Sequence, residues 1–229
     1  MKTKEKSIDD YLTQMVKIPS GEIEMRDDRT KKSWTVKLED FWLAKFPITQ
    51  DLYFELMQSN PSTFKGERRP VETISWFEAV VFCNQLSEKQ GLTSCYNTEN
   101  IEDVVFNPTA NGFRLPTEAE WEYACKAGKS GIRYGDLDEI AWYKTNSKSS
   151  TQNVGEKQAN EWELYDMLGN VWEWCNDIYD SEVYGSYRIL RGGGWSDEPR
   201  SVMATTRRRS HPTKFKIDDL GFRIAKNLG

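Results

Sequence analysis

Residues 112–122 read GFRLPTEAEWE, and this stretch decides how the middle of the chain folds. Thr117 is followed three positions later by Glu120. This is the spacing of a capping box, in which two side chains satisfy free backbone N–H groups at a helix start. The sequence therefore predicts a helix that begins at Thr117 and runs to Gly128. Further distinctive stretches follow in order: LYDMLGNVWEW at 164–174, RGGGW at 191–195 and LGFR at 220–223.

The segments around this stretch predict a mixed helix and strand domain. Ser75 and Glu78 repeat the capping-box spacing and predict a helix that ends near Gly91. Thr49 is the expected N-cap of a shorter helix. Strands are expected at 15–21, 34–38 and 220–225, and the signals become sparse after residue 134. We expect one loop-rich α+β domain over residues 15–229, with residues 1–14 as an N-terminal lead-in.

The composition narrows the classes of protein that the chain can belong to. Nine Trp, ten Tyr and ten Phe can hold an irregular, loop-rich fold together, because aromatic side chains bury large areas. A net charge of -5 argues against nucleic acid or anionic membrane as a partner. The sequence shows no membrane-spanning stretch and no secretory signal. With one His and no C-x-x-C pair, a zinc site is not expected.

Together, the four stretches resemble the formylglycine-generating-enzyme family, also called the sulfatase-modifying factors. The resemblance covers roughly residues 15–226 and includes the segment PVETISWFEA at 70–79. It implies a C-type-lectin-like fold, in which a few strands support long loops. A shared scaffold says less about function, because one fold hosts many roles.

The resemblance also shows that the family's reactive cysteines are missing. In its enzymes, a cysteine pair after the Arg-Gly-Gly motif binds copper, which activates oxygen to oxidise a substrate cysteine. Aligned on residues 191–193, this pair falls at Asp197 and Val202, so no copper and no formylglycine generation are expected. Secreted relatives pair the residues that match Cys83 and Cys125 in disulfides. Their partners are absent here, which favours a cytoplasmic location.

A calcium site is implied by the same resemblance. The family's Asp/Asn-x-x-Gly-Asn-x-Trp-Glu segment wraps a structural Ca²⁺ ion. Carried over, the ligands are the side chains of Asp166 and Glu173 and the carbonyl groups of Gly169 and Val171. A hard cation takes such a set of oxygen ligands. The alternative is that the two carboxylates cap turns or pair with arginines.

A ligand-binding surface is expected between Trp195 and His211. In relatives, the Trp-Glu-Trp and Gly-Gly-x-aromatic segments line a groove that receives a peptide. We expect Trp172 and Trp174 to point in opposite directions, one into the core and one into the groove. The candidate ligand-binding residues are Trp174, Trp195, Ser196, Asp197, Arg200, Arg209 and His211.

Three functions remain open at this point. The first is a non-catalytic domain that binds a protein or peptide. The second is a divergent metal-dependent oxidase or oxygenase that uses Asp197, Glu198 or His211. The third is a retroelement-diversified display protein, which the absence of Asn from residues 196–219 disfavours. We expect the first, because the scaffold is intact while the copper cysteines are lost.

Overall fold

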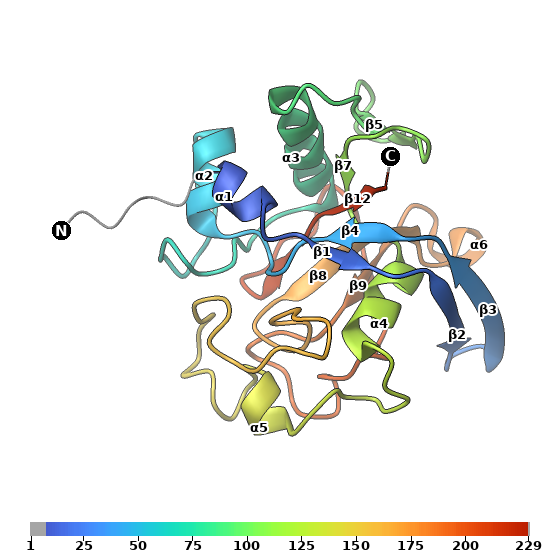
Figure 1. Cartoon of the computed structure of the whole chain (residues 1–229), viewed down its shortest axis with the longest axis vertical. Coiled ribbons are helices and arrows are strands. Elements are labelled where there is room, and N and C mark those ends of the chain that lie inside the picture. The colour runs from blue at the N-terminus through green and yellow to red at the C-terminus, as the bar shows by residue number, and fades with distance from the viewer. Residues whose placement is uncertain (1–7, 229) are drawn as a thin grey trace.

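The computed structural model describes residues 8–228, which form an α+β domain with strands at its centre (Figure 1). The helices are α1 (Ile8–Leu12), α2 (Gln50–Met57), α3 (Trp76–Lys89), α4 (Glu118–Lys126), α5 (Leu137–Ile140) and α6 (Ser181–Tyr184). The strands are β1 (Val16–Ile18), β2 (Gly21–Asp27), β3 (Lys32–Leu38), β4 (Phe41–Leu43), β5 (Tyr96–Asn97), β6 (Val105–Phe106), β7 (Phe113–Arg114), β8 (Trp172–Ile178), β9 (Arg188–Arg191), β10 (Arg208–Ser210), β11 (Leu220–Gly221) and β12 (Ala225–Asn227).

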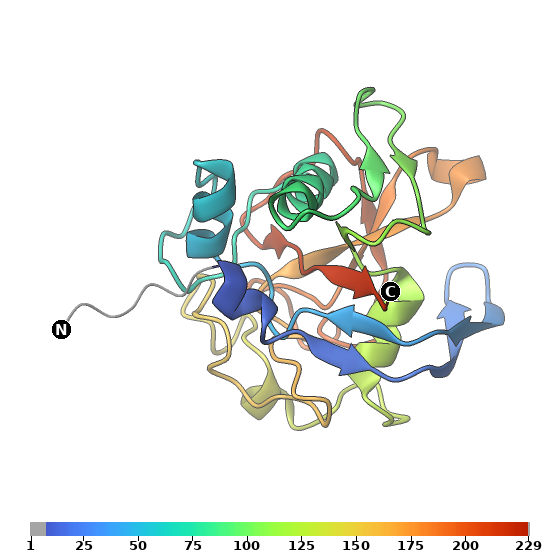
Figure 2. The same ribbon diagram turned by 45° about the horizontal axis from the view of Figure 1, so that its top comes forward.

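One four-stranded sheet joins the two ends of the described chain. Its order is β1-β4-β12-β7, and all its pairs are antiparallel. Leu43 on the central strand β4 faces Val16 of β1 on one side and Ala225 of β12 on the other. Figure 2 shows these strands side by side, with the β2–β3 hairpin projecting at the edge of the molecule. Early and late segments of the chain therefore share one scaffold.

A second four-stranded sheet carries the late motifs in the order β10-β9-β8-β11. β8 pairs antiparallel with β9 and parallel with β11. Its first five residues are all buried, so both faces of this strand are covered. β8 is thus a buried central strand, and its neighbours β9 and β11 stand at the two ends of the segment between residues 191 and 220.

Both predicted capping boxes are confirmed. The Ser75 hydroxyl accepts from the Glu78 N–H at the start of α3, and the Thr117 hydroxyl accepts from the Glu120 N–H at the start of α4. The Glu120 carboxylate also receives both ends of the Arg114 guanidinium, at 2.6 and 2.7 Å. The first turn of α4 is thereby tied to β7.

The loop-rich part predicted after residue 134 is also present. Residues 141–171 contain no helix or strand of two or more residues, and side-chain amides satisfy much of their backbone. The Asn160 amide donates to the carbonyl groups of Ala124 and Cys125 at 2.7 and 3.1 Å. Gly169 has φ +75°, and a Cβ at this position would stand 2.3 Å from the carbonyl oxygen of Trp142. Only glycine fits there.

The core contains charged side chains as well as apolar ones. The Arg223 guanidinium, fully buried, meets both oxygens of the buried Glu173 carboxylate at 2.7 and 2.8 Å. Arg191, equally buried, forms ion pairs with Glu118 and Glu122 on α4. Pairing and hydrogen bonding are what make a buried charge tolerable. No helix within residues 8–228 is long and apolar enough to cross a bilayer.

Several predicted boundaries are wrong. The closing strand expected at 220–225 is split into β11 and β12, which belong to different sheets. The chain passes from one sheet to the other between them, and Arg223 lies at this crossing, where it donates to Glu173 and to the Ala44 carbonyl. α4 ends at Lys126 rather than at Gly128, since Ala127 already takes a left-handed conformation. Thr49 is the N-cap of α2, but its hydroxyl bonds Asp51 instead of the helix backbone.

The lead-in expected at 1–14 is described from residue 8 onward. There it forms α1, whose Ile8 is buried in the main hydrophobic cluster. The Tyr11 hydroxyl donates to the Phe46 carbonyl at 2.8 Å. α1 is therefore packed against the domain.

Candidate functional site

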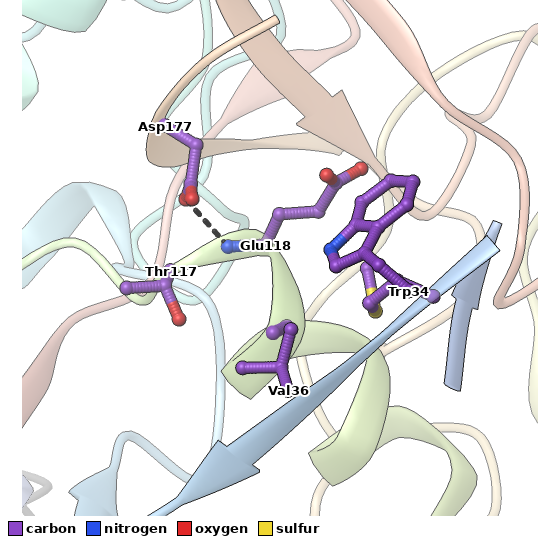
Figure 3. A pocket seen from close by; sticks show the side chains of 7 residues that line it. Trp34, Val36, Thr117, Glu118 and Asp177 are labelled. Carbon is purple, nitrogen blue, oxygen red and sulfur yellow. Dashed lines mark hydrogen bonds between the residues drawn. The ribbon is translucent and has the colours of Figure 1, made fainter. Parts of the chain in front are cut away.

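Two hollows flank the β2–β3 hairpin, and we name them by what they adjoin. The α4 hollow, about 200 Å³, lies between the hairpin and the start of α4 (Figure 3). Its lining residues are Met25, Trp34, Val36, Thr117, Glu118, Ala119 and Asp177. The turn hollow, about 350 Å³, lies between the hairpin turn and the segment 200–207. Its lining residues are Arg26, Asp27, Asp28, Arg29, Tyr179, Arg200, Met203, Thr205, Thr206 and Arg207.

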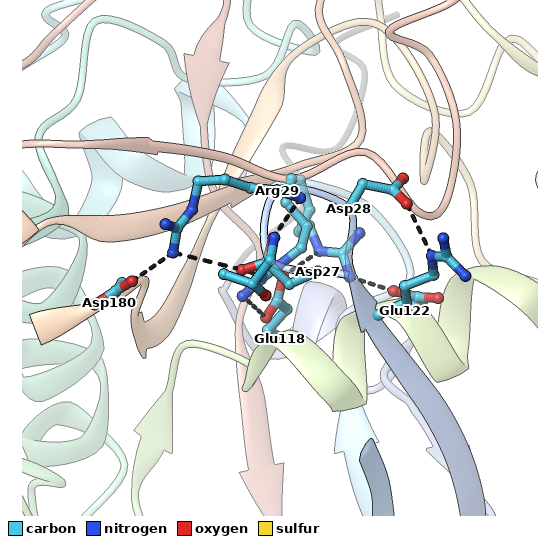
Figure 4. A network of polar contacts seen from close by, with 10 residues as sticks. Asp27, Asp28, Arg29, Glu118, Glu122 and Asp180 are labelled. Atoms are coloured by element: carbon cyan, nitrogen blue, oxygen red, sulfur yellow. Dashed lines mark hydrogen bonds and ion pairs between the residues drawn. The ribbon is translucent and has the colours of Figure 1, made fainter. Parts of the chain in front are cut away.

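Arg207 forms the boundary between the two hollows. Its guanidinium donates to both oxygens of Glu118 at 2.6 and 2.9 Å and lies 3.3 Å from the Asp27 carboxylate. Glu118 lines the α4 hollow, whereas Asp27 lines the turn hollow. Figure 4 shows this network continuing through Arg29 to Asp180 and through Glu118 toward Glu122. The boundary is a fixed charge network rather than a mobile side chain.

Beside the turn hollow, arginines stack on tyrosines. The Arg209 guanidinium lies 3.7 Å from the ring centre of Tyr184 and 4.9 Å from that of Tyr179. Arg29 lies 5.7 Å from the ring centre of Tyr184. A cation above an aromatic ring is attracted to the negative electrostatic potential of the ring face. These contacts fix Arg209 in place without a carboxylate.

The predicted ligand-binding residues fall into separate groups. Ser196 and Asp197 lie with Trp195 in the turn after Gly194. The Ser196 hydroxyl donates to Asp219 at 2.8 Å, and Asp197 accepts from the Trp172 indole at 2.6 Å. Arg209 and His211 lie instead near Tyr187 and the other tyrosines, with the His211 ring 5.8 Å from that of Tyr187. They therefore do not make one compact pocket.

Arg200 is the most available of the predicted residues. Its side chain is exposed, lines the turn hollow, and takes part in no hydrogen bond or ion pair within residues 8–228. Thr206, in the same hollow, has a buried hydroxyl oxygen that also has no partner within the described chain. The Arg200 guanidinium therefore keeps its hydrogen-bonding capacity for a ligand, whereas the Thr206 hydroxyl oxygen is too buried to be reached from the hollow.

The prediction that Trp174 lines a groove is wrong. Trp172 and Trp174 are both fully buried and belong to the same hydrophobic cluster. The reason is the period of a strand, in which residues two apart point to the same face. The Trp174 indole donates to the Ile74 carbonyl at 2.9 Å and thus holds α3 against β8. Trp195 is half-buried, and its indole donates to the Asp218 carbonyl at 3.0 Å.

The two positions matched to the family's copper cysteines hold no thiol. Asp197 accepts from the Gly194 N–H at 2.9 Å as well as from Trp172, and Val202 is fully buried. Cys83, Cys95, Cys125 and Cys175 are free and buried elsewhere. Burial raises the pKa of all four thiols, so they remain protonated at neutral pH.

The residues predicted to hold calcium are engaged in other contacts. Both Glu173 oxygens accept from Arg223, and one also accepts from the Trp121 indole at 2.8 Å. Arg223 additionally donates to the Asp166 carbonyl at 3.3 Å. The Asp166 carboxylate accepts from the Gly155 N–H at 2.7 Å. A guanidinium therefore supplies the positive charge that Glu173 needs, and the Glu173 end of the set does not fit Ca²⁺ as it stands. Calcium binding stays a prediction.

Some residues of the hollows were not predicted to line a site. Residues 26–29, at the end of β2 and the start of the hairpin turn, resemble an ordinary charged surface segment in the sequence. Asp177 lies one strand residue beyond the buried run of β8. The available signal was the aromatic residue Trp34 in an alternating strand, since aromatic side chains are enriched in protein interfaces. Whether a residue lines a hollow depends on which distant segments of the chain face each other in the folded structure.

Comparison with known proteins agrees with this geometry. The model of the sulfatase-modifying factor enzyme 1-like domain family matches residues 2–228. Chaperone protein LppX of Paenibacillus barcinonensis is 35% identical over 224 residues, which cover 81% of this chain and 78% of that protein. The inactive C-alpha-formylglycine-generating enzyme 2 of Bos taurus is 33% identical over 138 residues, 52% of this chain and 45% of that protein.

A solved structure supports the same assignment. Treponema denticola variable protein 1 is 31% identical and superimposes with a TM-score of 0.84, covering 93% of this chain and 95% of that one. The chain belongs to the sulfatase-modifying factor, or formylglycine-generating-enzyme, family.

Proposed function

We propose that this protein is a non-catalytic member of its family that binds a protein or peptide. The observation that carries the proposal is the chemistry at the former copper positions. Asp197 is bonded to Trp172 and Gly194, and Val202 is buried, so neither can offer a thiolate. Copper-dependent oxidation of a cysteine needs soft thiolate ligands, and the four thiols of this chain are buried and protonated.

The turn hollow is the proposed contact surface. It combines Arg200, which forms no hydrogen bond or ion pair within residues 8–228, with a floor held by the Arg207 ion pairs. Arginine and tyrosine are enriched in protein interfaces, and Tyr179 lines this hollow. A rigid floor under adaptable polar groups is what recognition requires. A chaperone and an inactive enzyme homologue among the relatives support a binding role.

Selection of displayed peptides on the immobilised protein tests this proposal. We expect enriched peptides with dissociation constants in the micromolar range, and Arg200→Glu should weaken them about tenfold or more. Lys148→Glu is the matched control, because Lys148 is also exposed and without a partner but lies outside both hollows. Equal weakening by the two variants would place the binding surface elsewhere.

The same peptides also test the enzyme alternative. A cysteine-containing binder is incubated with the protein, copper and oxygen, and its mass is measured. We expect an unchanged mass. A mass loss that corresponds to conversion of the cysteine to an aldehyde, sensitive to Asp197→Ala, would overturn the non-catalytic assignment.

The second candidate function is that of a diversified display protein. The likeness to Treponema denticola variable protein 1 over 93% of this chain favours it. Sequencing the encoding gene from independent isolates tests it. Substitutions concentrated between residues 196 and 219 would support diversification, whereas uniform sequences would exclude it.

A further inference from the structure

We infer that the α4 hollow binds the side chain of a lysine from the partner. This inference rests on the proposed function, because the lysine belongs to the bound protein or peptide. It adds a second contact point beside the turn hollow and assigns its chemistry.

The walls of the α4 hollow are apolar where an alkyl chain would pass. Met25 and Val36 come from the face of the hairpin that packs toward α4, and Ala119 lies in the first turn of α4. Trp34 stands across from Asp177, as Figure 3 shows, and is 38% exposed. A lysine stem packs well on apolar surface. The Arg207 guanidinium already lies 5.6 Å from the ring centre of Trp34, so the indole contributes apolar wall area rather than a free face for the ammonium group.

The carboxylate at the end of this hollow has no cationic partner. Asp177 accepts from the Glu118 N–H at 2.6 Å, and within residues 8–228 it forms no ion pair. Arg188, whose charge interacts with Asp177, and Arg207 are both engaged in other contacts. Arg207 is held by Glu118 and Asp27, and Arg188 stacks on Trp76 at 3.9 Å and donates to the Asn176 carbonyl.

The surroundings of Asp177 favour the arrival of a positive charge. Burial and the nearby Glu118 and Glu120 carboxylates raise the pKa of Asp177 to about 6. A buried carboxylate near other carboxylates is destabilised as an anion, and a cation at hydrogen-bond distance relieves that cost. An ammonium group that enters the hollow would therefore be selected over a neutral or acidic group.

The geometry favours lysine over arginine. The planar arginine fork binds best when both oxygens of a carboxylate are free. One oxygen of Asp177 already accepts the Glu118 N–H at the start of α4. The other oxygen suits a compact ammonium group, which needs only one acceptor in this direction. The Arg207–Glu118 pair lies between this hollow and the turn hollow.

The test uses small probes and does not need the natural partner. Acetyl-lysine methylamide is titrated into the ¹⁵N-labelled protein, and the Trp34 indole and Glu118 backbone N–H signals are followed. Acetyl-norleucine methylamide has a stem of similar length without the ammonium group and serves as the control probe. We expect saturable shifts at millimolar concentration with the lysine probe, and weaker or absent shifts with the norleucine and arginine probes.

Asp177→Asn tests the carboxylate itself. Its side-chain oxygen still accepts from the Glu118 N–H, so α4 keeps its first contact. The lysine affinity should fall about tenfold or more, the usual scale for removing a charged hydrogen-bond partner. Asp103→Asn, an exposed acid outside both hollows, should leave it unchanged. Equal binding of the norleucine probe, or full affinity in Asp177→Asn, would overturn the inference.

The outcome is separable from that of the proposed function. Peptides that bind through Arg200 while the lysine probe fails would keep the proposed function and refute the lysine site. Lysine binding without any selected peptide would keep the site and count against peptide recognition at the turn hollow.

Discussion

Arg223 and Arg200 show two opposite uses of one side chain in this domain. Arg223 is fully buried, and its guanidinium meets both oxygens of Glu173 and two backbone carbonyl groups within 3.1 Å. Arg200 is exposed and forms no hydrogen bond or ion pair within residues 8–228. The comparison shows that charge in the interior is used to join segments of the scaffold. Charge at the rim of the turn hollow is left available for a ligand.

The largest expected effect comes from breaking the interior pair. Arg223→Met leaves the Glu173 carboxylate buried without its cation, and this should lower the free energy of unfolding by about 3–5 kcal/mol. Urea denaturation followed by circular dichroism measures the loss. The double variant Arg223→Met/Glu173→Met should recover part of the stability, because it removes both charges together. A loss below about 1 kcal/mol would mean that Arg223 does not join the two sheets in the way described.

A smaller loss is expected where the loop-rich half meets the scaffold. In Gly169→Ala, the new Cβ would stand 2.3 Å from the Trp142 carbonyl oxygen, so unfolding should become easier by about 1–3 kcal/mol or more. Gly128→Ala is the matched control: its φ is also positive, at +82°, but nothing lies within 4 Å of the added atom. The control isolates the cost of the left-handed backbone, about 1–2 kcal/mol. Equal losses of unfolding free energy in the two variants would show that the loop around Gly169 shifts to accommodate the added Cβ atom.

A dependence on pH should come from Asp166. Burial raises its pKa to about 6, so the folded protein binds this proton more tightly than the unfolded chain does. The contribution of Asp166 to stability therefore improves as pH falls from 7 toward 5, through the folded-state pKa. Asp166→Asn should stabilise the protein at pH 7 by about 1–3 kcal/mol, and the gain should shrink toward pH 4. Denaturation at several pH values measures it. A gain that grows on acidification would contradict the shift.

Calcium addition distinguishes between Glu173 as a calcium ligand and Glu173 as the ion-pair partner of Arg223. If the ion binds at Asp166 and Glu173, its addition should raise the melting temperature and EDTA should reverse the change. Because Arg223 already neutralises Glu173, we expect the same melting temperature, within about 1 °C, with and without calcium. Elemental analysis of the purified protein gives an independent reading. Stoichiometric calcium would show that Arg223 moves aside for the ion.

The smallest effect is expected at the rim. Arg200→Ala should change the free energy of unfolding by less than about 0.5 kcal/mol, as surface substitutions usually do. The same denaturation experiment with Arg207→Ala should give a clearly larger loss, because Arg207 holds Glu118 and Asp27 together. Equal losses in the two variants would contradict the description of Arg207 as structural and of Arg200 as available for a ligand.

Local patterns in the sequence were sufficient for the elements whose cause is local. The capping boxes at Ser75 and Thr117 depend on residues three positions apart, so both helix starts could be predicted. The four motif stretches likewise identified the family and its α+β fold. An arginine partner for Glu173 was anticipated as the alternative to calcium, although the sequence did not say which arginine it would be.

The tertiary structure decided the rest. Trp174 is buried because β8 is covered on both faces, and coverage depends on segments far away in the sequence. The closing strand is divided between two sheets, and Arg223 lies between its halves and reaches Glu173. Both hollows arise where the hairpin at 21–38 meets α4 and the segment 200–207. A sequence shows which side chains are present, but pairing across more than a hundred residues determines which of them remain unpaired and free to bind.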